Sequence, residues 1–297
     1  MAAKILIFFY IFAFLKIKFM VKKKILYIAS EIFPYLPSSY ISDLCRYLPQ
    51  GIQEKDNEIR TFMPKYGCIN ERKNLLHEVI RLSGQNIIIE DSDHPLIIKV
   101  ASLQAVRMQI YFIDSEDFFK RKQIFRDENG TFFPDNDSRA IFFAKGVIET
   151  VCKLGWTPDI IHCHGWITAL VPMFIKTYYK DNPYFQDTRI VYSAYNDHFA
   201  ENFDKNFSKK LNLTGIQENF LNHLKKPNYD SLIKTAIDFS DAAVIGHPEV
   251  KDSIKEYMKK QNRPIFTHNI NDNEEKLYVD KYDLFYDQLM TKTPTNF

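Results

Sequence analysis

Short apolar runs alternate with segments of helical periodicity along most of this chain. Residues 25–29 form an apolar run typical of a buried strand, whereas residues 40–52 repeat apolar side chains at helical spacing. Because the alternation continues to residue 261, the sequence predicts strands joined by right-handed helical crossovers. The expected fold class is α/β, with a Rossmann-like, mostly parallel sheet and helices on both of its faces.

The predicted elements divide the chain into three parts. Strands are predicted at residues 25–30, 59–63, 79–82, 86–90, 96–103, 108–113, 159–162, 189–194 and 242–245, and helices at 40–52, 137–154, 166–179, 229–239 and 248–261. Residues 79–113 show few helical signals and are predicted to form an antiparallel insertion. A Rossmann-like domain is therefore expected at 20–265, between an apolar segment at 1–19 and a partly helical tail at 266–297.

The apolar segment at the start needs its own interpretation. Residues 5–15 are apolar throughout, but a membrane-spanning helix needs about 20 such residues. The segment suits the apolar part of an export signal, yet the residues after it offer no small-residue cleavage site. Because a buried strand begins just after Met20, we expect the protein to start at or near Met20, and residues 1–19 to be an upstream extension. A membrane-associating segment and an export signal are the alternatives.

Charge and cysteine content exclude several classes of protein. Lys and Arg number 39 and Asp and Glu 37, so a net charge of +2 gives no electrostatic case for a nucleic-acid partner. The cysteines are widely spaced and fit neither a zinc knuckle nor a disulfide framework: Cys45, Cys68, Cys152 and Cys163. Reduced thiols in a cytoplasmic protein are therefore expected.

A polar loop separates the first predicted strand from the first helix. Ser38 and Ser39 stand just before the helix, and Asp43 lies in its first turn. Free N–H groups and the helix dipole attract anions to a helix N-terminus, so these residues form a candidate phosphate site. The alternative is that one serine simply caps the helix.

Two more polar segments follow predicted strands. His162, His164 and Trp166 follow one strand, and Tyr195 and Asn196 follow the next. Ligands of an open parallel sheet bind at the carboxyl ends of its strands. We expect one histidine to pack under the sheet and the other to face the crevice. Because spacing places no third ligand beside the two histidines, no metal is expected.

Six segments in chain order resemble bacterial glycogen synthases and plant starch synthases. They are KILYIASEIFP at 24–34, IRTFMPKYG at 59–67, PDNDSRAIFF at 134–143, PDIIHCHGW at 158–166, SAYN at 193–196 and AIDFSDAAV at 236–244. The first resembles the family's opening strand with its SE-x-x-P motif, and the fourth resembles its P-D-V-x-H-x-H-D-W-H motif. The resemblance spans roughly residues 22–260.

The resemblance implies the N-terminal half of a two-domain glycosyltransferase of the B fold. Enzymes of this family transfer glucose from ADP-glucose to the 4-hydroxyl at the non-reducing end of an α-1,4-glucan, with retention of configuration and without metal or other cofactor. The second domain, which carries the nucleotide pocket in the family, has no counterpart in this sequence. The resemblance therefore assigns no catalytic residue to this chain.

Several motif positions depart from the family pattern. The family's K-T-G-G-L phosphate loop reads PSSYI here, and only 9 of the 297 residues are glycine, about 3% against a usual ~7%. Close backbone approach to a diphosphate favours glycine, so Tyr40 is expected to crowd it. Gly165 stands in place of the Asp of the H-D-W-H motif, and Tyr195 in place of a His. ADP-glucose is thus expected to bind weakly if at all.

The retained motif positions imply a sugar site. Asp135, Asn136, His164 and Asn196 are expected to bond sugar hydroxyls, and Trp166 or Tyr195 to stack on a sugar ring. Two functions follow. The first is a glucosyltransferase domain working with a separately encoded second domain. The second is a non-catalytic glucan-binding or regulatory remnant, whose partner is an α-1,4-glucan or maltooligosaccharide.

Overall fold

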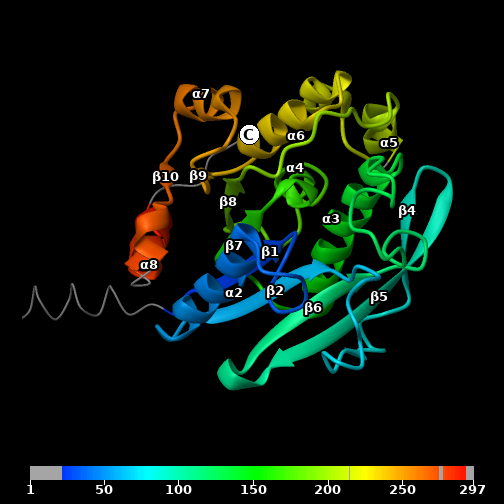
Figure 1. Cartoon of the computed structure of the whole chain (residues 1–297). Coiled ribbons are helices and arrows are strands. Elements are labelled where there is room, and N and C mark those ends of the chain that lie inside the picture. The colour runs from blue at the N-terminus through cyan, green and yellow to red at the C-terminus, as the bar shows by residue number, and fades with distance from the viewer. Residues whose placement is uncertain (1–21, 214, 274–276, 292–297) are drawn as a thin grey trace, which may run out of the picture.

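A sheet of ten strands runs through the computed structural model, which describes residues 22–213, 215–273 and 277–291 (Figure 1). Its order is β10-β9-β8-β7-β1-β2-β6-β5-β3, with β4 paired to β5. The strands are β1 (Lys24–Ala29), β2 (Glu58–Pro64), β3 (His77–Glu78), β4 (Gln85–Ile89), β5 (Ser92–Leu103), β6 (Met108–Asp114), β7 (Ile160–His164), β8 (Arg189–Ala194), β9 (Ala242–Ile245) and β10 (Ile265–Thr267). The expected segment at 1–19 and the start at Met20 lie outside the described residues.

The strands from β10 to β6 are parallel to their neighbours, and β1 lies among them between β2 and β7. Such a strand is buried on both faces, which explains the unbroken apolar run of β1. The predicted α/β fold with a mostly parallel sheet is confirmed. The carboxyl ends of these strands lie along one edge of the sheet.

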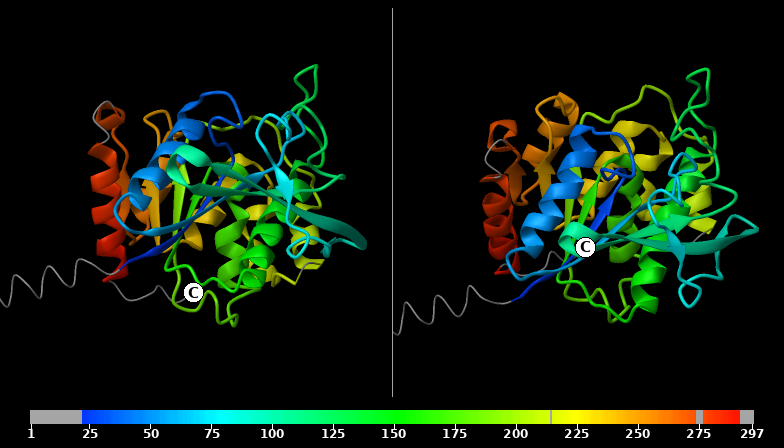
Figure 2. Two further views of the ribbon diagram at one scale, coloured as in Figure 1. Left: turned by 90° about the horizontal axis from the view of Figure 1, so that it is seen from below. Right: turned by 60° about the horizontal axis from the view of Figure 1, so that its bottom comes forward.

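Helices cover both faces of the sheet (Figure 2). The two on one face are α2 (Tyr40–Gln53) and α8 (Leu277–Met290), which contact each other. The opposite face carries α3 (Asn136–Lys153), α4 (Leu170–Lys176) and α6 (Tyr229–Asp238), and α4 contacts both of the other helices. Side chains alternate along a strand, so neighbouring residues of β7 face different layers.

The antiparallel insertion forms the end of the sheet away from α8 (Figures 1 and 2). As predicted, β5 pairs antiparallel with β6, β4 and β3. The strand predicted at 79–82 is wrong, because these residues form a turn after β3 and Leu82 N–H donates to the Val79 carbonyl. The turn leads to Gly84, which has φ +83°.

The helix predicted at 166–179 is interrupted. Residues Trp166–Thr168 form a 3₁₀ turn, and α4 begins only at Leu170. Pro172 lacks the N–H that would bond the Thr168 carbonyl in a continuous α-helix, so the two turns cannot join regularly. The helix predicted at 248–261 is also shorter, and is observed as α7 (Asp252–Lys260).

The C-terminal tail is built into the fold. β10 pairs with β9, and α8 lies against the sheet with Tyr282 and Tyr286 fully buried. Lys23, just before β1, bonds Asp283 at 2.9 Å and also contacts Asp287. Within the tail, α8 closes one face of the sheet.

Candidate functional site

Loops from four parallel strands meet at the carboxyl edge of the sheet. Ser30 N–H, after β1, donates to the His164 carbonyl of β7, and Gly246 N–H, after β9, donates to the Ala194 carbonyl of β8. We call the polar side chains on these loops and on the first turn of α2 the strand-end cluster: Glu31, Ser38, Ser39, Asp43, Asn196 and Asp197. Five of the expected site residues lie elsewhere or beneath this cluster.

The N-terminus of α2 is occupied by hydroxyls and carboxylates. Ser39 caps the helix by accepting from Ser42 N–H at 3.0 Å, and its own hydroxyl donates to Glu31 Oε2 at 2.6 Å. Ser38 Oγ donates to Asp43 Oδ2 at 2.6 Å. Carboxylates near a helix N-terminus stabilise the helix by about 0.3–1 kcal/mol each. They also place negative charge where an incoming phosphate would lie.

Two carboxyl groups of the cluster titrate abnormally. Burial raises the pKa of Glu31. The hydrogen bond from Ser39 lowers this pKa in part, and the negative charge of Asp197 raises it further. Burial also raises the pKa of Asp197, against hydrogen bonds from Trp166 N–H at 2.7 Å and the Tyr229 hydroxyl at 2.9 Å. Both raised pKa values have burial as their largest cause, so these two carboxyl groups lie in a poorly hydrated part of the carboxyl edge.

Gly165 joins the loops after β1, β7 and β8. It has φ +86°, and a Cβ built there would lie 2.4 Å from Ser30 Oγ and 3.2 Å from Asp197 Oδ2. Ser30 is 2% exposed, and its hydroxyl has no hydrogen-bond partner among the described residues. The backbone adopted here therefore suits glycine, which stands in place of the Asp of the H-D-W-H motif.

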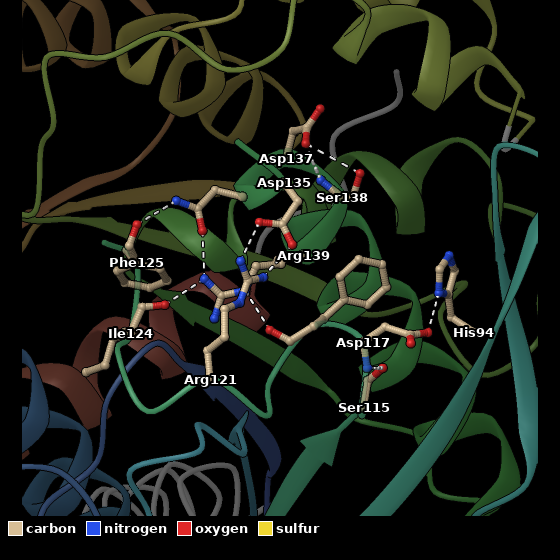
Figure 3. Close-up of polar contacts among 12 residues, drawn as sticks. His94, Ser115, Asp117, Arg121, Ile124, Phe125, Asp135, Asp137, Ser138 and Arg139 are labelled. Atoms are coloured by element: carbon tan, nitrogen blue, oxygen red, sulfur yellow. Dashed lines mark hydrogen bonds and ion pairs between the residues drawn. The ribbon is translucent and has the colours of Figure 1, made fainter. Parts of the chain in front are cut away.

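Asp135 and Asn136 stand at the start of α3, where Figure 3 shows Arg121 and Arg139 near Asp135. Asp135 forms a two-point ion pair with Arg121, one contact being 3.0 Å, and its side chain is 33% exposed. Asn136 is fully buried, donating to the Phe125 carbonyl at 2.9 Å and accepting from Arg139 at 2.7 Å. The Asp135 side chain is accessible to a ligand, whereas the Asn136 side chain is buried and hydrogen-bonded within the protein.

Arg139 is a structural residue that the sequence analysis did not single out. Its fully buried guanidinium donates to the carbonyls of Phe118 at 2.9 Å and Ile124 at 2.6 Å, and lies over the Phe119 ring. Burial lowers the pKa of Arg139 to about 10. These bonds fix residues 118–125 against α3, so the arginine of the PDNDSRAIFF segment supports the loop beside Asp135.

Both histidines of β7 are fully buried on the face covered by α8, so the expectation that one of them faces the crevice is wrong. His162 Nδ1 and Nε2 lie 2.7 Å from the Tyr286 hydroxyl and from Ser193 Oγ. His164 Nδ1 lies 2.6 Å from the Tyr195 hydroxyl. Residues two apart on a strand share a face, and the two rings are 3.9 Å apart. His164 therefore presents no atom to the crevice.

The two aromatic residues expected to stack on a sugar are buried as well. Tyr195 is 0% exposed, and Trp166 is 3% exposed. Phenylalanine rings surround Trp166 with centroid distances of 4.5–6.2 Å: Phe125, Phe132, Phe199 and Phe203. In this structure both side chains are parts of the core, because loops distant in sequence close over them.

Tyr40 and Asn196 lie nearer the surface. The Tyr40 ring contacts Tyr195, His247 and His268, with centroid distances of 6.3, 4.7 and 5.8 Å, and so spans the ends of β8, β9 and β10. Asn196 is exposed, and its Nδ2 donates to Glu249 Oε2 at 3.1 Å. Of the expected sugar ligands, Asn196 and Asp135 are the ones that remain accessible.

The buried histidines give the fold a dependence on pH. Burial, reinforced by His164, lowers the pKa of His162, and burial, reinforced by His268, lowers the pKa of His164 to about 3. Below about pH 6.5 only the unfolded chain takes up these protons. The free energy of unfolding should therefore fall by up to about 1.4 kcal/mol for each histidine with every pH unit of acidification. For His164 the loss continues to about pH 3.

Urea unfolding at pH 7.5, 6.5, 5.5 and 4.5 measures this slope. The variant His198→Gln, which changes an exposed histidine, should keep it. A stability that is flat or that rises between pH 6.5 and 4.5 would contradict the assignment of both histidines as buried and neutral.

The described residues, 22–213, 215–273 and 277–291, contain neither a cluster placed to hold a metal ion nor a helix able to cross a membrane. Within these residues, no group of three or more His, Cys, Asp and Glu side chains is placed to hold a metal ion. No helix in the same part of the chain is long and apolar enough to cross a membrane.

Comparison with known proteins identifies relatives of this chain. A family model described as the starch synthase catalytic domain matches residues 24–264. The chain is 41% identical over 174 residues to a glycogen synthase of Chlorobium limicola, covering 58% of this chain and 36% of the relative. It is 34% identical over 246 residues to one of Chlorobaculum tepidum, covering 80% and 50%. The chain thus spans about half or less of the length of these curated relatives.

A solved structure shares the fold. The catalytic domain of starch synthase IV from Arabidopsis thaliana, bound to ADP and acarbose, superposes with a TM-score of 0.65 at 20% identity. The match covers 86% of this chain and 53% of that chain. At this identity the likeness establishes the α/β architecture.

Proposed function

Because this chain belongs to the starch synthase catalytic domain family, matching its model over residues 24–264, we propose that it is the acceptor-side half of a glucosyltransferase. In this proposal it binds an α-1,4-glucan, and glucose arrives at the glucan's non-reducing end from ADP-glucose held mainly by a separately encoded second domain. The cytoplasm is the proposed place of action.

One observation carries the assignment to the acceptor side: carboxylates, not phosphate-binding groups, occupy the start of α2. Ser38 is bonded to Asp43 and Ser39 to Glu31, so both hydroxyls that could hold a phosphate are already donors to acids. The negative charges of Asp43 and Glu31 would repel the negative charges of a diphosphate at short range. The same acids and the exposed Asn196 offer acceptors and donors that suit the neutral hydroxyls of a glucan.

A non-catalytic glucan-binding or regulatory protein is the second candidate. The serine–carboxylate pairs at α2 favour it too, because they weaken donor binding whether or not a second domain exists. The two candidates differ in one respect. Only the first predicts that glucose is transferred when a partner supplies the nucleotide pocket.

Transfer of labelled glucose tests the choice. Purified chain is incubated with ADP-[¹⁴C]glucose and glycogen, alone and with extract from cells that lack this protein. We expect no transfer by the chain alone and transfer above the extract background in the mixture. If no mixture transfers more glucose than the extract alone, the first candidate is rejected in favour of the second. Transfer by the chain alone would reject the assignment to the acceptor side.

Donor binding should respond to the charges at α2. The chain should bind ADP-glucose with a Kd above about 1 mM, a free energy weaker than about −4 kcal/mol. The variant Glu31→Gln/Asp43→Asn removes two acids and should strengthen binding by about thirtyfold, because each screened charge at short range contributes about 1 kcal/mol and the two together about 2 kcal/mol.

Calorimetry of both proteins measures the effect. The matched control Glu116→Gln/Asp117→Asn removes two acids from an exposed loop and should leave the affinity unchanged. Micromolar binding by the unaltered chain, or no gain in the Glu31→Gln/Asp43→Asn variant, would show that the carboxylates do not block the phosphate.

A further inference from the structure

A cavity lies at the edge of the sheet opposite the strand-end cluster. α6 ends at Asp238 just before β9, and α7 ends at Lys260 just before β10, so the space between these helix ends lies at the amino ends of the strands. Its volume of about 520 Å³ falls within the range of about 300–1,000 Å³ typical of small-ligand sites. No part of the strand-end cluster lines it.

Amides and aromatic rings line this amino-end cavity. Asn219, Asn222 and Gln261 contribute side-chain amides, each both a donor and an acceptor. Phe220 and Tyr257 contribute partly buried rings, and Phe220 is held edge-on against Phe239 at 5.6 Å. Amides beside flat apolar surfaces match a ligand that has hydroxyls around its rim and apolar faces.

The charged groups of the cavity are already paired within the protein. Asp238 accepts from the Tyr257 hydroxyl at 2.6 Å and lies 2.9 Å from His223 Nε2. Arg263 donates to the Ile237 carbonyl at 2.7 Å and to the Ser240 carbonyl. One carboxylate and one guanidinium balance each other, so the lining favours a neutral ligand over a phosphate or a cation.

We propose that the amino-end cavity is a second carbohydrate-binding site, which takes one or two pyranose units of a neutral oligosaccharide. The choice of an α-1,4-glucan as that oligosaccharide rests on the proposed function. Because this site lies at the opposite edge of the sheet from the strand-end cluster, it can hold one segment of a glucan while another reaches the cluster.

Calorimetric titration of the full chain with maltotriose tests the site. The variant Asn222→Ala/Gln261→Ala removes two amides from exposed or half-buried positions and should weaken the amino-end site by about tenfold. The control Asn129→Ala changes an exposed asparagine in another loop and should bind as the unaltered chain does. Inorganic phosphate at equal concentration should not displace maltotriose.

The outcomes separate this site from the strand-end cluster. The variant Glu31→Gln/Asn196→Ala alters only the cluster and should leave binding at the amino-end cavity in place. Equal maltotriose affinity and stoichiometry in the unaltered chain and in Asn222→Ala/Gln261→Ala would overturn the proposal, as would displacement by phosphate or an absence of binding. Glucose transfer, measured separately, decides the proposed function independently.

Discussion

Replacing Tyr286 by alanine is expected to lower the free energy of unfolding by about 4 kcal/mol or more. Tyr286 is fully buried, and its hydroxyl lies 3.1 Å from the Tyr27 hydroxyl and 2.7 Å from His162 Nδ1. Loss of a buried aromatic ring costs about 3–5 kcal/mol, and a stranded polar partner costs about 1–3 kcal/mol more. The effect is large because α8 closes the layer over β1 and β7.

The variant Tyr286→Phe is the matched control, since it keeps the ring and removes only the hydroxyl. It should cost about 1–3 kcal/mol by leaving His162 and Tyr27 without this partner. Urea unfolding followed by circular dichroism gives both values. A loss below about 1 kcal/mol for Tyr286→Ala would mean that α8 is not part of the cooperative core.

Replacing Gly165 by alanine is the second large expected effect, a loss of about 3 kcal/mol or a failure to fold. Gly165 has φ +86° and ψ 160°, a region essentially restricted to glycine, where another residue costs about 1–3 kcal/mol. The new Cβ would also meet Ser30 Oγ at 2.4 Å and Ser30 Cβ at 2.9 Å. The strain and the close contact add to each other.

Two further variants separate these causes. Gly130 has φ +80° with no atom within 4 Å of an added Cβ, so Gly130→Ala should cost only about 1–2 kcal/mol. Adding Ser30→Gly to Gly165→Ala removes the contact but not the backbone strain, and should restore part of the loss. Equal destabilisation by Gly130→Ala and Gly165→Ala would contradict the close packing of the loops after β1 and β7.

The elements of the parallel sheet could be predicted well from sequence. The predicted strands at 189–194 and 242–245 coincide with β8 and β9, because strands buried on both faces show as unbroken apolar runs between turn residues. The short β10 was missed, since three partly exposed residues carry no such signal. The turn at 79–82 was mistaken for a strand because its apolar residues resemble one.

The surroundings of the motif residues could not be predicted in the same way. His162 contacts Tyr286, which follows it by 124 residues in the chain. Trp166 contacts Phe199 and Phe203, which lie on a loop distant in sequence. Strand periodicity alone would have placed both histidines on one face, but it does not show which helix covers that face. Glu31 lies in the segment that resembles the SE-x-x-P motif, but its hydrogen bond with Ser39 depends on how the loop after β1 folds.

We propose that this chain retains glucan binding and lacks effective donor binding. Side-by-side calorimetric titration of the full chain with maltoheptaose and with ADP-glucose tests both parts of this proposal. We expect measurable binding of maltoheptaose, and a Kd for ADP-glucose above about 1 mM. Micromolar affinity for ADP-glucose, or no measurable binding of maltoheptaose, would overturn this proposal.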